Sequence, residues 1–307
     1  MRRQVMEIVR PLVGLLIITA AFLALAPTFR QWVAITDVLE NSAVLFIMCT
    51  GMTVALIANC LDLSVGSIYA LVSVVTGQLL AVYKLPVPVC ILGGVLTGVL
   101  CGFINGSIVV KTGVPTLIAT LGTQMIFRGI ANMIGSGVDM SRFPEVFGWL
   151  GRGTLGPVVC SVISFIVIWF FLSKTKLGFQ AYAQGGNQEV ARLAGIPVNR
   201  NKVIYYMICG TMAALSSIVY TSRVDFAHVN RGQGIELWAI AGVVIGGTSM
   251  FGGVGGVGKT VIGVLIITVL QAGLIHLHVE AFWQQVAIGV VIIVAVWLDF
   301  LQRSNKA

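Results

Sequence analysis

Polar residues interrupt two of the long apolar stretches of this sequence, and their types suit contact with a polar solute. The first interruption, residues 58–67, holds one carboxylate together with hydroxyl and amide groups. In the second, residues 120, 124 and 128 lie four apart and so share one face of a helix. Such groups cost several kcal/mol when they face hydrocarbon without a partner, so they must face protein or water. We expect one shared aqueous path lined by Asp62, Ser64, Ser67, Asn105, Thr120, Thr123 and Gln124.

Three of the polar residues also have a structural interpretation. Asp62 precedes Ser64 and an apolar run, so it can cap the next helix or lie in a short cytoplasmic loop. Asn105 is a lone polar residue of the kind that joins two helices by hydrogen bonds. Arg128 lies late in its apolar stretch, which favours a side chain that reaches the outer membrane surface. The two interpretations of Asp62 stay open on the sequence alone.

The longest polar segment, residues 173–202, contains a short predicted helix. Asn187 is a good N-cap, and Glu189 lies in the first turn, where the helix dipole favours negative charge. Apolar residues at positions 190, 193 and 194 share one face, and Gly195 ends the helix. A short amphipathic helix between two spans suits docking into a groove on a soluble partner. The alternative is a helix that lies on the membrane surface.

A phosphate-loop pattern, G-x-x-x-x-G-K-[ST], is matched by residues 253–260. In nucleotide-binding folds this loop joins a buried strand to a helix, and its backbone amides cradle phosphates. Here it joins two apolar runs, and Asp299 is the only later aspartate that could hold magnesium. We therefore expect no nucleotide site in this loop.

Metal and cofactor sites are not predicted. His276 and His278 lie two apart without a carboxylate or cysteine nearby, which is a poor metal site. The six cysteines are scattered through apolar runs without a C-x-x-C pair. Catalytic signatures such as G-x-S-x-G and H-E-x-x-H are absent from the sequence. The sequence predicts neither a metal, nor a cofactor, nor enzymatic activity.

The elements that hold these residues are predicted to be membrane helices. Hydrophobic residues make up 57% of the 307 residues and charged residues 10%, whereas soluble domains carry about 25% charge. Crossing the bilayer takes about 20 apolar residues per helix. The sequence predicts an all-α polytopic protein with about ten spans, at residues 11–26, 42–58, 68–82, 87–110, 114–135, 157–172, 203–222, 236–250, 260–275 and 281–298.

The placement of basic residues predicts the orientation. With the N-terminus inside, twelve Lys and Arg residues fall in cytoplasmic segments and six outside, while Arg128 lies within a span. This bias places both termini and the 173–202 loop in the cytoplasm. The net charge of +8 follows from this topology and calls for contact with anionic lipid rather than nucleic acid. Because Arg2, Arg3 and Arg10 precede the first run, a cleaved signal peptide is the alternative for residues 11–26.

Short motifs spread along the chain occur in the order found in one transporter family. They comprise Asp62-Leu-Ser-Val-Gly-Ser67, Asn105-Gly106, Thr120-Leu-Gly-Thr123 with Arg128-Gly129, Gly185-Gly-Asn187, Ala191-Arg-Leu-Ala-Gly-Ile196, Glu236-Leu-Trp-Ala-Ile-Ala241, Val244-Ile-Gly-Gly-Thr248 and Gly252-Gly253. On these motifs the sequence resembles the permease subunits of ribose-type ATP-binding-cassette sugar importers. Two departures are Asn59-Cys60-Leu61, where the family commonly has glycines, and Gly258-Lys259-Thr260, where it often has a Gly-Thr turn.

The resemblance implies the partners and the setting. Family members have about ten spans and pair with a second permease, identical or paralogous, in the bacterial inner membrane. They receive a monosaccharide or similar solute from a periplasmic binding protein, and a cytoplasmic ATPase pair supplies energy. The whole chain, residues 1–307, is then one permease domain. The resemblance makes the 173–202 loop the coupling loop, with ATPase contact at Asn187, Glu189, Ala191, Arg192, Leu193 and Gly195.

An ion-coupled secondary transporter of a small solute is the alternative function. Such a transporter needs carboxylates or histidines at membrane depth to couple ion and solute movement. Asp62 and Glu236 are the candidates in this sequence. The transported sugar is not specified by these motifs, because residues along the path need not select it.

Overall fold

The computed structural model describes residues 2–138 and 140–304, and within these ranges the regular elements are helices joined by turns and loops, with one isolated bridge between Ser141 and Phe226. Residues 1, 139 and 305–307 of the predicted domain lie outside the described residues. The helices are α1 (Arg2–Leu25), η1 (Pro27–Arg30), α2 (Trp32–Ile57), α3 (Val65–Ala81), α4 (Val87–Thr112), α5 (Thr116–Gly135), α6 (Glu145–Gly148), α7 (Leu155–Lys174), α8 (Lys176–Gly186), α9 (Gln188–Leu193), α10 (Val198–Val224), α11 (Ile235–Ile245), α12 (Val257–His276) and α13 (Ala281–Ser304).

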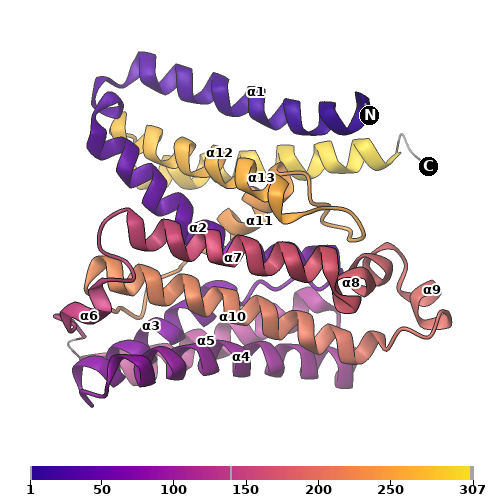
Figure 1. Cartoon of the computed structure of the whole chain (residues 1–307), viewed down its shortest axis with the longest axis horizontal. Coiled ribbons are helices and arrows are strands. Elements are labelled where there is room, and N and C mark those ends of the chain that lie inside the picture. The colour runs from indigo at the N-terminus through magenta and orange to yellow at the C-terminus, as the bar shows by residue number, and fades with distance from the viewer. Residues whose placement is uncertain (1, 139, 305–307) are drawn as a thin grey trace.

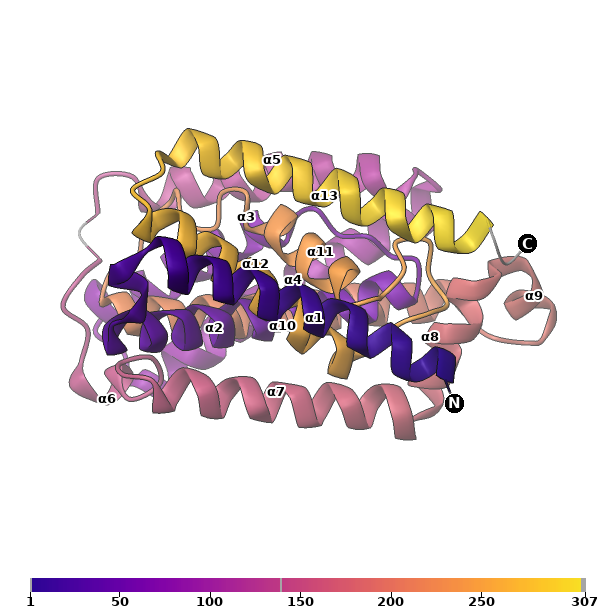
Figure 2. The ribbon, with the colours of Figure 1, turned by 90° about the horizontal axis from the view of Figure 1, so that it is seen from above.

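The long helices run roughly along one axis of the molecule, with short elements at both ends (Figures 1 and 2). The short helix α6 marks one end, which we call the α6 end. At the opposite, α9 end lie α8, α9, the start of α1 and the end of α13 (Figure 2). The start of α1 and the end of α13 therefore lie at the same end as the predicted coupling loop.

Burial separates a central helix from peripheral ones. In the most apolar 18-residue stretch of α2, 89% is buried inside the protein, whereas in the corresponding stretch of α7 only 22% is buried. Exposed large apolar residues such as Ile163, Ile166 and Phe170 line α7, a pattern expected where a helix faces lipid rather than water. Within the described ranges, six helices are long and apolar enough to cross a membrane.

The other four predicted spans also form helices, but their apolar parts are shorter. These apolar segments are Pro11–Leu25, Val65–Ala81, Ile235–Ile245 and Phe282–Trp297. The prediction of a helix over 236–250 was wrong at its end, because α11 stops at Ile245. Gly247 then takes a φ of +94°, a conformation that breaks a helix and that glycine adopts without strain.

A glycine stripe holds α4 against α10. Gly98, Gly102 and Gly106 lie at four-residue spacing, and a Cβ added at any of them would overlap backbone atoms of α10. Small residues at this spacing let two helix backbones approach closely. The two helices thus form a close-packed pair inside the fold.

Candidate functional site

The break between α2 and α3 is organised by one buried carboxylate. Asp62 has no exposed surface, and its Oδ1 accepts hydrogen bonds from Ser64 N at 2.8 Å and Ser64 Oγ at 2.7 Å. Asn105 Nδ2, from α4, donates to both carboxylate oxygens at 3.2 and 3.1 Å and to Ser64 Oγ at 2.7 Å. Asp62 therefore fixes the turn that starts α3 and ties it to α4.

Residues on either side complete the break. Ser67 Oγ donates to Ser64 O at 2.7 Å, and Asn59 takes a φ of +54° in the left-handed region. Asparagine tolerates this conformation better than most residues, and glycine adopts it without strain. Asn59 therefore adopts the backbone shape that this turn needs.

The polar face of α5 points inward as predicted, but its residues have protein partners. Thr120 Oγ1 donates to Thr116 O at 2.9 Å, and Thr123 Oγ1 donates to Thr120 O at 3.2 Å, so both hydroxyls are satisfied within the helix. Gln124 Nε2 donates to Oε1 of Glu236, at the start of α11, at 2.9 Å. This face therefore joins α5 to α11.

Arg128 bonds three backbone carbonyls and joins three segments. Its Nη1 donates to Val229 O at 2.9 Å and Arg231 O at 2.8 Å, and its Nη2 donates to Gly66 O at 3.1 Å. These carbonyls belong to the break and to the 225–234 loop, and the guanidinium has five donors with which to bond them. Two of the three lie in the loop that the sequence places outside, and a side chain that reaches the outer membrane surface stays a prediction.

The predicted break and the predicted polar face meet at Gly66. A Cβ at this position would overlap Glu236 Oε2 and Gly232 O, so α3, α11 and the 225–234 loop are in close contact here. Glu236 is buried, and its Oε2 has no hydrogen-bond partner within the described residues. In this conformation the residues of the two segments pack against each other, and their exposure to a solute path stays a prediction.

The short helix α9 has the predicted caps. Asn187 Oδ1 accepts from the backbone N–H groups of Glu189 and Val190, both at 3.0 Å, and Gly195 has a φ of +78°. Ala191 is buried against the loop, whereas Leu193 is 89% exposed. Arg192 Nη2 donates to Asn199 Oδ1 at 3.4 Å. The helix thus presents an apolar side chain outward, without cover from the described part of the chain.

Helix α8 connects α9 directly to the break. Gln184 Nε2 donates to Ala58 O at 3.1 Å, and a Cβ at Gly185 would overlap Ile57 O. Gly253 N also donates to Ile57 O, at 2.9 Å. The end of α2 is therefore held between α8 and the glycine-rich loop.

The loop that matches the phosphate-loop pattern serves packing. Tyr182 Oη, from α8, donates to Gly255 O at 3.1 Å, and the hydroxyl of Thr260 lies 2.9 Å from that of Thr53 on α2. Thr260 has no exposed surface, so its hydroxyl is not available to a magnesium ion. The glycines allow close approach to α8, and the loop joins two helices rather than a strand and a helix.

A cavity at the α6 end was not anticipated from the sequence. It has a volume of about 310 Å³ and lies between α2, α3, α10, the 225–234 loop with α11, and α12. Tyr69, Tyr220, Arg231 and Gln271 are among its lining residues. Its walls come from five separate segments, so no spacing in the sequence indicates it. The feature of the sequence that could have indicated the cavity is Gln271, a polar residue within the apolar run of α12.

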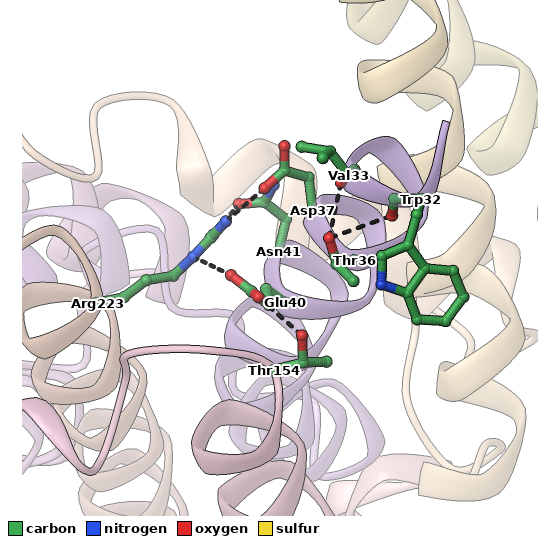
Figure 3. A network of polar contacts seen from close by, with 8 residues as sticks. All are labelled: Trp32, Val33, Thr36, Asp37, Glu40, Asn41, Thr154 and Arg223. Atoms are coloured by element: carbon green, nitrogen blue, oxygen red, sulfur yellow. Dashed lines mark hydrogen bonds and ion pairs between the residues drawn. The ribbon is translucent and has the colours of Figure 1, made fainter. Parts of the chain in front are cut away.

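An ion-pair network borders this cavity (Figure 3). Arg223, at the end of α10, lies 2.7 Å from Glu40 Oε2 and 3.2 Å from Asp37 Oδ1, both on α2. It also donates to Asn41 Oδ1 at 2.7 Å, and Thr154 donates to Glu40 Oε1 at 2.9 Å. The network ties α10 to α2 and to the start of α7.

Among the described residues, no cluster of three or more His, Cys, Asp or Glu is arranged to hold a metal ion.

Comparison with known proteins places the chain among transport permeases. Residues 34–296 match the family described as branched-chain amino acid transport system / permease component. The ribose import permease of Escherichia coli (strain K12) is 36% identical over 94% of this chain and 92% of its own length. The ribose import permease of Bacillus subtilis (strain 168) is 38% identical over 96% and 93%, and the D-allose transport system permease of E. coli (strain K12) is 38% identical over 94% and 90%.

No solved structure matches the chain significantly. The predicted resemblance to permeases of ribose-type importers is confirmed by relatives that are matched over almost their whole length. Such relatives are transport components, and the helices described above suit a membrane protein. The chain therefore belongs to the permease-component family of branched-chain amino acid transport systems, among members similar to ribose and allose import permeases.

Proposed function

We propose that this chain is the membrane permease of an ATP-binding-cassette importer that moves a monosaccharide or similar small polar solute into the cytoplasm. The observation that carries the proposal is 36–38% identity to ribose and allose import permeases over nearly the whole of both chains. The chain itself provides the path through the bacterial inner membrane, and a separate ATPase hydrolyses ATP.

The proposed topology has ten spans and both termini in the cytoplasm. It is supported by the basic residues of the cytoplasmic segments and by the position of the ends of α1 and α13 near α9 (Figure 1). The α6 end then faces the periplasm and receives solute from the binding protein. Residues 1–307 act as one domain, and a second permease, identical or paralogous, completes the pathway.

The proposed coupling route runs from α9 through α8 to the break. An ATPase that docks on the exposed face of α9, at Glu189, Arg192 and Leu193, would displace α8. Because α8 bonds the carbonyl of Ala58, such a displacement bears directly on the turn that contains Asp62. Alternating access needs two states whose balance a partner biases, and this route supplies the connection.

The proposed solute route includes the break and the polar face of α5. It is supported by the contact of the two segments at Gly66 and by the hydrogen-bonding groups that they bring together, namely Asp62, Ser64, Ser67, Asn105, Thr120, Thr123 and Gln124.

Reconstitution tests the proposal. The chain is purified with its native partners and inserted into liposomes, and uptake of labelled D-ribose, D-allose and D-galactose is measured with ATP present or absent. We expect uptake of at least one sugar only with ATP and the ATPase. Uptake driven by an ion gradient without ATP would contradict the proposal and favour a secondary transporter.

A further inference from the structure

The cavity at the α6 end has the size of a site for one small molecule. Its volume of about 310 Å³ falls at the lower limit of typical ligand pockets, which span about 300–1,000 Å³. A single sugar ring fits such a space, whereas an oligosaccharide does not. Buried residues, among them Tyr69, Leu45 and Thr268, form its floor, while Asn41, Asn230 and Gln233 are exposed at its rim.

Several polar groups of the cavity lack protein partners. No hydrogen bond joins the side-chain amides of Gln233 and Gln271 to another residue within the described ranges. The buried Nε of Arg231 likewise has no acceptor there. Asn41 uses its Oδ1 to accept from Arg223, which leaves its NH₂ group as a donor beside the cavity (Figure 3). A buried donor without a partner is costly, so a ligand oxygen that accepts from Arg231 Nε would be stabilised here. The half-buried amide of Gln271 and the exposed amides of Asn41 and Gln233 can bond the same ligand.

Aromatic rings supply the apolar part of the cavity. The rings of Tyr69 and Tyr220 lie 6.0 Å apart between centroids, and Trp238 also lines the space. The guanidinium of Arg231 lies 5.4 Å above the Tyr220 ring and donates to its hydroxyl at 3.3 Å. Flat aromatic surfaces with polar edges suit a ligand that is apolar on one face and rich in hydroxyl groups at its edge.

The charges of the cavity favour a neutral ligand. Among its lining residues there is no carboxylate, and the carboxylates of Asp37 and Glu40 at its border are paired with Arg223, so no carboxylate is left to balance a cationic solute there. The one cation, Arg231, already interacts with Tyr220 by a cation–π contact and a hydrogen bond. The remaining polar lining residues carry amides and hydroxyls, which both donate to and accept from neutral hydroxyl groups.

We infer that this cavity is a binding site on the permease itself for one neutral monosaccharide, held by Gln271, Gln233, Asn41 and Arg231 and stacked on the aromatic rings. The inference rests on the proposed function, and it adds that the permease holds the sugar at the outer entrance before the break opens. The backbone carbonyl of Arg231 accepts from Arg128, which also bonds Gly66 in the break. The side chain of Arg128 thus connects the segment that would hold the sugar, at Arg231, to the break at Gly66.

Equilibrium binding of labelled sugars tests the site. The full chain is placed in lipid nanodiscs without the binding protein, and binding of tritiated D-ribose, D-allose and D-galactose is measured. We expect saturable binding of at least one of them, at about one sugar per chain. Gln271→Met keeps the length of the side chain but removes its amide, and it should weaken binding at least tenfold, as should Asn41→Ala.

Gln31→Ala is the matched control, because Gln31 is an exposed glutamine that does not line the cavity, and it should bind as the unaltered chain does. Elution as a single species in gel filtration excludes misfolding of each variant. Failure of the unaltered chain to bind any of the sugars, or equal binding by Gln271→Met, overturns the inference. So does preferential binding of the anion D-ribonate, because the site would then select a charged ligand.

Uptake by the reconstituted importer separates this inference from the proposed function. Uptake driven by ATP that is unchanged in Gln271→Met would refute the site and leave the importer function intact. Absence of sugar uptake by the unaltered importer would instead refute the importer function, whatever the nanodiscs bind.

Discussion

At the scale of single residues, Asp62 holds the break between α2 and α3 together. Its carboxylate is fully buried, and Ser64 and Asn105 provide its hydrogen bonds. A buried carboxyl group of this kind is tolerated only when hydrogen bonds compensate for its lost hydration. The same dependence makes the turn sensitive, because any displacement of α4 or of α8 alters the partners of this carboxylate or the backbone that leads to it.

Asn105→Ala should destabilise the protein by about 1–3 kcal/mol, since it leaves the buried carboxylate of Asp62 without its donor from α4. The measurement is the thermal unfolding midpoint in detergent. Thr97→Ala on the same helix is the control, because Thr97 bonds only the carbonyl of Gly93 in its own helix. Equal midpoints for the two variants would show that the contact between Asp62 and Asn105 does not hold the break.

Gly66→Ala should reduce sugar uptake at least tenfold, because the added methyl group would overlap Glu236 Oε2 and Gly232 O. Gly129→Ala is the control, since a Cβ there has nothing within 4 Å. The double variant Gly66→Ala, Glu236→Ala removes one of the two obstacles and should recover part of the uptake. Normal uptake by Gly66→Ala alone would mean that α3 and α11 are not packed this closely.

At the scale of elements, features that depend on neighbouring residues were predicted, whereas contacts between residues far apart in the sequence were missed. The caps of α9 at Asn187 and Gly195 follow from a few neighbouring residues, and so does the inward face of α5. The partners of Arg128 do not, because Val229 and Arg231 lie about a hundred residues away. The end of α11 was also misplaced, since residues 246–250 carry no charge that would mark the end of a span, although the glycines at 246 and 247 break the helix.

The double variant Glu189→Ala, Arg192→Ala should reduce both transport and the stimulation of ATP hydrolysis, while the permease still inserts in the membrane. Both side chains are exposed on α9, and the described part of the chain offers them little contact, so their loss should spare the fold. The measurements are uptake and ATPase activity of the assembled importer. The matched control is Lys111→Ala, because Lys111 is an exposed charged residue in the last turn of α4, outside the 173–202 loop. Uptake equal to that of the unaltered importer would remove α9 from the coupling route.

At the scale of the whole molecule, the polar groups fall into two zones on the way from the α6 end to the α9 end. The cavity bordered by Arg223 and Arg231 lies at the α6 end, and the packed break around Asp62 is bonded to α8, at the α9 end (Figure 1). Hydropathy predicted the helices that carry both zones. The cavity could not be predicted, because it exists only once five separate segments come together.

This arrangement predicts that the break is closed at rest and accessible only during transport. Single cysteines are introduced by Ser64→Cys, Ser67→Cys, Thr120→Cys and Gln124→Cys in a chain from which the six native cysteines have been removed. A water-soluble thiol reagent should modify them slowly in the resting importer, because Ser64, Ser67 and Thr120 have no exposed surface. Modification should accelerate at least tenfold when ATP and sugar drive turnover, since each polar group then faces the solute path.

Two control positions calibrate the accessibility measurement. Asn230→Cys, at the exposed rim of the cavity, should react in every state. Ser73→Cys should stay unreactive, because Ser73 is buried and lies 2.9 Å from the hydroxyl of Thr221, in the contact between α3 and α10. If positions 64, 67, 120 and 124 behave like position 73 even during turnover, these residues are packing groups, and the solute crosses the membrane by another route.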